Sequence, residues 1–147
     1  RDNFFGTGID ISKKALNVAS FNAKVHQLGN RVKFYNSDID KFLFGKYDII
    51  ISNPPYIENS RLKYLDRGIT AYEPIIALDG GNDGCSKVKK VIYRASGLLK
   101  NNGKLILEIG FNQKKMVLNI LKKNSFYINK VQKDYGMKDR CIICTKI

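Results

Sequence analysis

The sequence lacks several residue types on which common protein architectures depend. It contains no tryptophan, one histidine, three prolines and three cysteines in 147 residues. Because three is an odd number and the chain opens without a signal-peptide pattern, the sequence predicts no disulfide framework. No apolar run approaches the ~20 residues of a membrane-spanning helix. We therefore expect a cytoplasmic chain without a membrane partner.

Metal ligands are equally scarce. Cys141 and Cys144 have the spacing of a metal-binding or redox pair, but they fall in an expected strand, where residues three apart face opposite sides. No second cysteine pair accompanies them, and His26 is distant in the sequence. We interpret the cysteines as structural and predict no metal site.

Acidic residues are also few, with 13 Asp and Glu against 26 Lys and Arg, so the formal net charge is +13. Such a charge fits contact with RNA, the ribosome or DNA through a basic surface. The alternative is a lysine-rich composition without a specific partner. Lysines make up 20 of the basic residues and are spread along the chain, whereas arginine is the preferred bidentate reader of phosphate. Both interpretations stay open.

The chain nevertheless has the apolar content of a folded domain, with 44% hydrophobic and 11% aromatic residues. We expect strands at 4–9, 32–35, 47–52 and 104–109, and a final antiparallel pair at 127–131 and 140–145. Helices are expected from Ser12 to a stop at Gly29, at 86–99 and around 116–121. Strands that alternate with helices predict an α/β fold with a mostly parallel sheet.

The most informative stretch is IIISNPPY at residues 49–56. Its first four residues predict a parallel strand covered on both faces, and the two prolines end that strand. Ligands bind at the carboxyl ends of such strands. The Asn53 amide donates and accepts hydrogen bonds, the Pro54 carbonyl is a free acceptor, and Tyr56 offers a flat face. This combination suits holding a planar –NH2 group whose nitrogen takes part in a reaction; the alternative is a plain turn.

Two acids follow expected strands at the same edge of the sheet. Asp10 stands before a helix, where a carboxylate commonly binds ribose hydroxyls. Asp38 comes one helix and one strand later, and suits the exocyclic amine of an adenine ring, with Ile39 and Phe42 packed beside it. The alternative for both acids is a solvated turn.

Residues 57–85 are expected to form a long irregular loop, which in a compact domain is usually functional. The loop carries Tyr72-Glu73-Pro74 and the glycine-rich run ALDGGNDG at 77–84. We interpret it as a substrate-recognition loop, with a flexible lid as the alternative.

In this order the motifs resemble the catalytic domain of the HemK/PrmC family, the release factor glutamine N5-methyltransferases. The matching segments span nearly the whole chain: GIDIS at 8–12, NPPYI at 53–57, YEP at 72–74, ALDGG at 77–81 and LEIG at 107–110. The resemblance implies a Rossmann-like, S-adenosylmethionine-dependent methyltransferase fold with an antiparallel C-terminal pair. It also implies transfer of a methyl group to the glutamine of the Gly-Gly-Gln motif in class 1 peptide chain release factors.

The same resemblance implies roles for individual residues. The catalytic residues would be Asn53, Pro54, Pro55 and Tyr56. Binding of S-adenosylmethionine would fall to Asp10, Ile11, Asp38, Ile39 and Asn53. The substrate would contact Asn53, Pro54, Tyr56, Glu73 and Pro74.

The chain departs from the family at its start. The family's first glycine-rich motif and its helical N-terminal domain have no counterpart here, so we expect residues 1–147 to be a partial, N-terminally truncated catalytic domain that starts just before the second strand. The absent strand would be central, which leaves two unpaired edges. We expect the chain alone to bind the methyl donor poorly.

Three other functions stay open. A ribosomal-protein glutamine methyltransferase is a close relative, although that branch usually has Ala-Gly in place of Gly80-Gly81. A DNA or RNA methyltransferase acting on adenine N6 or guanine N2 shares the Asn-Pro-Pro-Tyr motif. The third is an inactive fragment.

Overall fold

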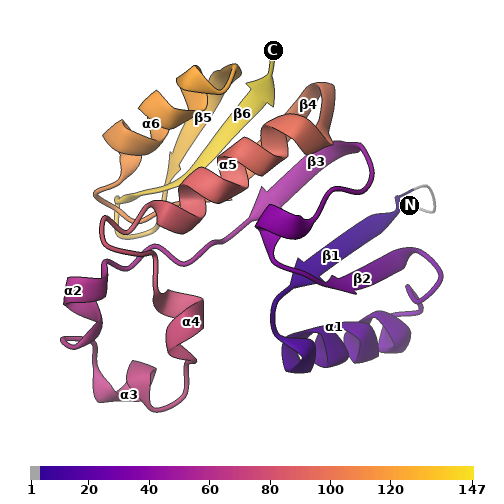
Figure 1. The fold of residues 1–147 in the computed structure, drawn as a ribbon, viewed down its shortest axis with the longest axis horizontal. Coiled ribbons are helices and arrows are strands. Elements are labelled where there is room, and N and C mark those ends of the chain that lie inside the picture. Colours follow the sequence, from indigo (N-terminus) through magenta and orange to yellow (C-terminus); the bar gives the residue numbers. More distant parts are fainter. Residues whose placement is uncertain (1–3) are drawn as a thin grey trace. The chain divides into compact units, whose positions relative to one another are not determined.

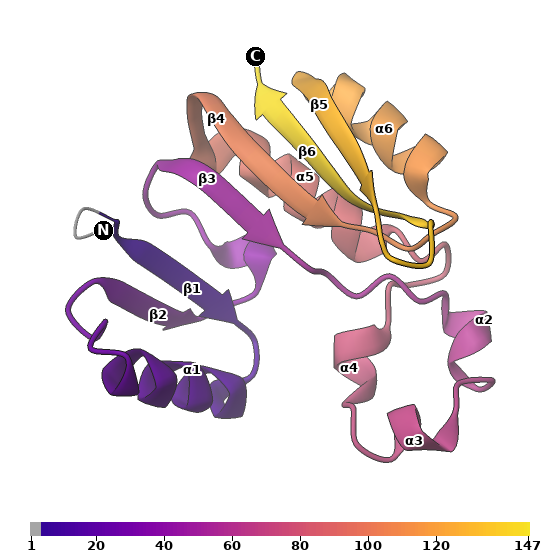
Figure 2. The same ribbon diagram turned by 180° about the vertical axis from the view of Figure 1, so that it is seen from behind.

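The computed structural model describes residues 4–147, which divide into two compact units, one up to Leu43 and one from Phe44 to Ile147 (Figures 1 and 2). The first unit contains β1 (Gly6–Asp10), α1 (Lys13–Val25), β2 (Val32–Asn36) and the 3₁₀ helix η1 (Ile39–Lys41). β1 and β2 are parallel, with Gly6 opposite Val32 and Asp10 opposite Asn36. The two strands therefore end together at one edge.

Helix α1 begins as expected and ends early. The Ser12 hydroxyl caps it by accepting a hydrogen bond from the Ala15 N–H at 3.2 Å. The helix stops at Val25 rather than continuing to Gly29. Gln27 takes the left-handed conformation with φ of 56°, and the Leu28 N–H donates to the Ala23 carbonyl at 2.7 Å. The cap thus forms before the glycine is reached.

The second unit is a four-stranded mixed sheet with helices. Its elements are β3 (Tyr47–Ser52), α2 (Asn59–Leu62), α3 (Arg67–Thr70), α4 (Ile75–Leu78), α5 (Ser86–Leu98), β4 (Leu99–Glu108), α6 (Lys114–Lys123), β5 (Phe126–Lys133) and β6 (Asp139–Lys146). The strand order is β3-β4-β6-β5. β3 and β4 are parallel, whereas β6 is antiparallel to both of its neighbours. This confirms the expected parallel sheet with an antiparallel C-terminal pair.

The core of this unit lies between the sheet and helices α5 and α6, which cover the same face (Figures 1 and 2). β4 and β6 contribute fully buried residues that lie opposite each other, Leu105 beside Cys144 and Leu107 beside Ile142. The helices bury an apolar stripe against them: Val88, Val91, Ile92, Ala95, Leu98, Val117 and Leu121.

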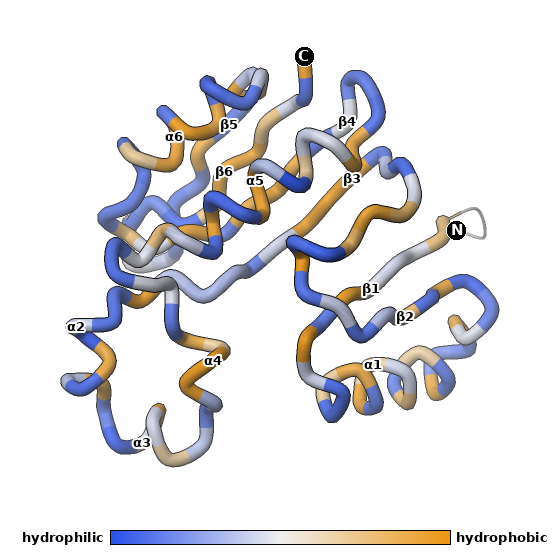
Figure 3. Tube along the Cα trace, viewed as in Figure 1, coloured by the Kyte–Doolittle hydropathy of each residue, from blue (hydrophilic) through white to orange (hydrophobic). Residues whose placement is uncertain are grey.

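The expectation that β3 is covered on both faces is wrong within this unit. Ile50 lies opposite Leu105, so side-chain alternation puts Ile49 and Ile51 on the face away from α5 and α6. Ile51 is 74% exposed. Among the described strands, β3 pairs only with β4, and β1 only with β2, so each has one open edge. Figure 3 shows the hydrophobic run along β3 and the hydrophilic stretch that follows it.

The loop at 57–85 is less irregular than expected. It contains the one-turn helices α2, α3 and α4, and extends away from the sheet (Figure 1). Asp66 caps α3 by accepting a hydrogen bond from the Gly68 N–H at 2.6 Å. No helix in residues 4–147 is both long and apolar enough to cross a membrane.

Replacing Leu107 by alanine should leave a cavity in the sheet–helix core. We expect a loss of about 3 kcal/mol in unfolding free energy, since buried Leu→Ala changes typically cost 2–5 kcal/mol. The matched control is Ile51→Ala on the exposed face, with an expected loss below about 1 kcal/mol. Urea unfolding followed by circular dichroism measures both. Equal losses would contradict the assignment of the core to one face.

The three free cysteines should differ in reactivity. Burial raises the pKa of Cys85 to about 11 and that of Cys144 to about 12, whereas Cys141 is only partly buried. Because the thiolate is the nucleophile, a raised pKa means slow alkylation at pH 8. We expect iodoacetamide mass labelling to modify Cys141 first. In denaturant all three should react alike. Rapid modification of Cys144 in the native state would be inconsistent with its complete burial.

Candidate functional site

The Asn-Pro-Pro-Tyr turn lies directly after β3. Asn53 is exposed, Pro54 is buried, and Pro55 and Tyr56 are half-buried. Within the described residues, the Asn53 side-chain amide makes no hydrogen bond. A rigid, anchored turn therefore presents a free amide at the carboxyl end of a parallel strand, as the sequence predicts.

A glutamine that no sequence pattern points to holds this turn in place. Gln113 is 4% exposed and lies just before α6. Its Nε2 donates to the Tyr56 carbonyl at 3.1 Å and to the Gly84 carbonyl at 2.9 Å, and its Oε1 accepts from the Gly110 N–H at 2.9 Å. One side chain thus joins the turn, the glycine-rich loop and the segment after β4.

The glycine-rich loop packs directly on the turn. A Cβ atom on Gly80 would lie 2.8 Å from the Tyr56 Cα and 2.5 Å from the Gly84 carbonyl oxygen. Gly84 has a φ of +66°, and a Cβ there would lie 2.8 Å from the Tyr56 carbonyl oxygen. The Gly80 N–H also donates to the Ile57 carbonyl at 2.8 Å. These glycines are required for close backbone approach.

Tyr56 is oriented by charged residues of β4 and β6. Its hydroxyl lies 3.4 Å from Glu108 Oε1 and 3.4 Å from the Arg140 guanidinium, which also sits 5.8 Å from the ring centroid. Arg140 in turn donates to Asp134 at 3.1 Å and to the Ile109 carbonyl at 3.0 Å. Burial raises the pKa of Tyr56, with Arg140 opposing and Glu108 reinforcing that shift. The phenol is therefore neutral at physiological pH.

The first unit contains the two acids predicted to bind the methyl donor. Asp10 Oδ1 accepts from the Ser12 N–H at 2.7 Å, and Asp38 Oδ1 accepts from the Asp40 N–H at 3.2 Å, so each carboxylate builds a turn. Asn36 fixes the backbone between them by donating to the carbonyls of Asp10 and Ile11 at 3.0 and 2.9 Å. No sequence pattern indicates this role for Asn36.

The flanking apolar residues of this unit are available for contact. Ile11 is 47% exposed beside Asp10, and Ile39 is half-buried at the start of η1, directly after Asp38. The structure therefore brings these two residues and the two acids together at the carboxyl ends of β1 and β2.

Glu73 and Pro74, predicted to contact substrate, lie between α3 and α4 and are exposed. In the described part of the chain, no hydrogen bond links them to the Asn-Pro-Pro-Tyr turn. Likewise, nowhere in residues 4–147 do three or more His, Cys, Asp or Glu side chains form a group suited to a metal ion.

Comparison with known proteins identifies the fold family. Residues 2–142 match the family described as a methyltransferase domain. The chain belongs to this family. It is 42% identical over 146 residues to the release factor glutamine methyltransferase of Fusobacterium nucleatum, covering 95% of this chain and 40% of the relative. It is 43% identical over 108 residues to the ribosomal protein uL3 glutamine methyltransferase of Francisella tularensis, covering 73% of this chain and 34% of that protein.

The methyltransferase chain thus spans less than half the length of each of these relatives. The identity to a release factor glutamine methyltransferase confirms the resemblance expected from the motifs. Solved structures bear out the Rossmann-like fold. The ribosomal protein L11 methylase of Lactobacillus delbrueckii superposes with a TM-score of 0.68 at 16% identity, covering 96% of this chain and 57% of the other. A Pyrococcus furiosus methyltransferase superposes with a TM-score of 0.67 at 17% identity, covering 95% of this chain and 61% of the other.

Replacing Gln113 by alanine should loosen the turn. Two buried carbonyls and one N–H lose their partner, so we expect about 3 kcal/mol of destabilisation. Gln113→Glu should not rescue the fold, because a carboxylate cannot donate to the Tyr56 and Gly84 carbonyls. Gln132→Ala, an exposed change, serves as control and should stay within about 0.5 kcal/mol. Denaturant unfolding measures all three; a neutral Gln113→Ala would contradict the anchoring role.

Proposed function

We propose that the methyltransferase chain forms part of an S-adenosylmethionine-dependent protein-glutamine N5-methyltransferase acting on the Gly-Gly-Gln glutamine of class 1 release factors. The observation that carries this proposal is the free, exposed Asn53 amide on a turn anchored by Gln113. The relatives' names support a protein glutamine as the acceptor, and their association with translation agrees with a cytoplasmic enzyme.

The residues of the first unit fit the adenosine part of the donor. Asp10 and Asp38 each use one carboxylate oxygen for a turn, which leaves the second oxygen as an acceptor for ribose hydroxyls or an adenine amine. Ile11 and Ile39 lie beside them and suit an apolar ring face. When bound, the donor supplies an electrophilic methyl group.

On the acceptor side, Asn53 and the Pro54 carbonyl would hold the glutamine amide, and Tyr56 would pack against its plane. The amide nitrogen attacks the methyl carbon in line, the bond from that carbon to the sulfonium sulfur breaks with its electron pair moving to sulfur, and the nitrogen then loses a proton. A primary amide is a weak nucleophile, so orientation and exclusion of water would provide most of the rate acceleration.

Removing the Asn53 amide should abolish methyl transfer while leaving the fold intact. With tritiated S-adenosylmethionine and a purified release factor, we expect Asn53→Ala to lose at least about 100-fold in kcat/KM, since misorientation alone has such an effect. Asn53→Asp should lose similarly because a carboxylate cannot donate. Asn101→Ala, which changes an exposed asparagine of β4, is the control.

Further acceptors and a donor titration separate the alternatives. A release factor with its Gly-Gly-Gln glutamine replaced by alanine should receive no label; transfer to uL3 or RNA instead would replace the proposal with one of the other two substrate classes. The first experiment is a calorimetric titration of S-adenosylmethionine into the chain and into its Asp10→Ala variant, which measures donor binding. Donor binding without transfer to any acceptor would indicate a non-catalytic module, and no donor binding would refute activity of this chain alone.

A further inference from the structure

The two long helices of the second unit carry positive charge only. Helices α5 and α6 contain eight basic and no acidic residues: Lys87, Lys89, Lys90, Arg94, Lys114, Lys115, Lys122 and Lys123. Both helices lie on the same face of the sheet (Figure 1), and three of these residues, Lys89, Lys115 and Lys123, line one surface between the helices. We call it the α5–α6 surface.

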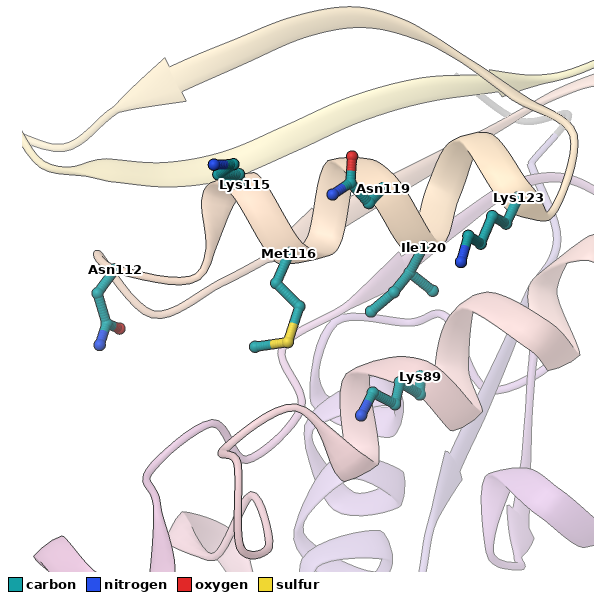
Figure 4. A pocket seen from close by; sticks show the side chains of 7 residues that line it. All are labelled: Lys89, Asn112, Lys115, Met116, Asn119, Ile120 and Lys123. Atoms are coloured by element: carbon teal, nitrogen blue, oxygen red, sulfur yellow. The ribbon is translucent and has the colours of Figure 1, made fainter.

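Several of these lysines lie at the N-terminal ends of the helices, where the helix dipole repels a positive charge. Lys87 and Lys89 lie near the start of α5, and Lys114 and Lys115 open α6, while neither helix has an acid in its first turn. A helix N-terminus carries a partial positive charge, so lysines there reduce stability. The two helices run in the same direction (Figure 4), and their N-terminal partial charges therefore add to the lysine charges. Asp83 and Asp139 offset part of this repulsion through ion pairs with Lys89 and Lys114, and an anionic partner would offset the rest.

A groove between the helices provides a binding surface. It has a volume of about 460 Å³ and is lined by Lys89, Asn112, Lys115, Met116, Asn119, Ile120 and Lys123. Met116 and Ile120 extend from α6 toward α5 (Figure 4). No acid lines the groove. Lys89 pairs with Asp83, whereas none of the ion pairs found within residues 4–147 involves Lys115 or Lys123.

The groove also offers contacts suited to nucleotides. Asn112 and Asn119 provide amides that both donate and accept hydrogen bonds. Tyr93 lies outside the groove lining, one turn after Lys89 on the same side of α5. It is 68% exposed and has the Arg94 guanidinium 6.0 Å from its ring centroid. Exposed aromatic side chains such as Tyr93 stack on unpaired bases.

We propose that the α5–α6 surface binds single-stranded RNA through its phosphate backbone. Lys115 and Lys123 line the groove and take part in none of the ion pairs of residues 4–147, so they are available to a flexible polyanion. The exposed Tyr93 and the asparagines match bases and sugars rather than an acidic peptide. This site lies outside the Asn-Pro-Pro-Tyr turn and does not depend on methyl transfer, so a failed methylation assay leaves it intact.

The test is fluorescence anisotropy with a labelled single-stranded RNA of about 20 nucleotides, longer than the site of one small domain. The groove variant is Lys115→Glu with Lys123→Glu. The control variant is Lys13→Glu with Lys14→Glu, two exposed lysines in the first turn of α1 that give the same change in net charge. Thermal melts establish that all three proteins are folded.

We expect the groove variant to lose at least about tenfold in affinity near 100 mM salt and to show a shallower salt dependence, whereas the control changes less than about threefold. Equal losses in both variants would mean that binding follows total charge, and would overturn the assignment to this groove. An undiminished groove variant would do the same. If poly-glutamate competes as well as unlabelled RNA, the partner is an acidic protein and the RNA proposal is wrong.

Discussion

The buried amide of Gln113 is the contact on which the geometry of the acceptor turn depends. Pro54 and Pro55 have no N–H, so half of the turn's residues cannot donate from the backbone, and the contact to Gln113 is made through the Tyr56 carbonyl. A glutamine amide supplies two N–H donors and one acceptor in a single plane, which matches the carbonyls of Tyr56 and Gly84 and the N–H of Gly110. A charged side chain at this position would have to be desolvated.

The rest of the turn's surroundings follow from that anchor. Since Gln113 binds Gly84 and Tyr56 together, the glycine-rich loop must approach within contact of the turn, and only glycine leaves room at positions 80 and 84. Arg140, from the interior strand β6, then contacts the hydroxyl and the ring of Tyr56. The antiparallel C-terminal pair is therefore part of the site's support as well as of the core.

Local sequence patterns predicted the helix cap and the positions of the main strands and helices. Ser12 caps α1, and β3 and α5 appear where the apolar periodicity of 47–52 and 86–99 placed them. The strand at Ile49–Ile51 was predicted, but the exposure of one of its faces was not. The apolar sequence of a strand does not depend on whether a neighbouring element covers that face. Gln113 contacts a residue 57 positions away, and no periodicity encodes such a distance. The roles of Asn53 and Asp10 stay predictions, made from their residue types at the ends of strands and from the family motifs.

The distribution of acids explains why a chain with evenly spread lysines has an uneven surface. Five aspartates each accept a hydrogen bond from the backbone N–H two residues ahead and thereby stabilise turns: Asp10, Asp38, Asp66, Asp79 and Asp83. None of the α-helices in residues 4–147 contains one. Lysines on the α-helices therefore have no carboxylate within their own helix to offset their charge, although Lys89 and Lys114 pair with the loop acid Asp83 and the strand acid Asp139. The positive charge collects on helical faces as a consequence of where turns are needed, and a polyanion is the partner that such faces attract.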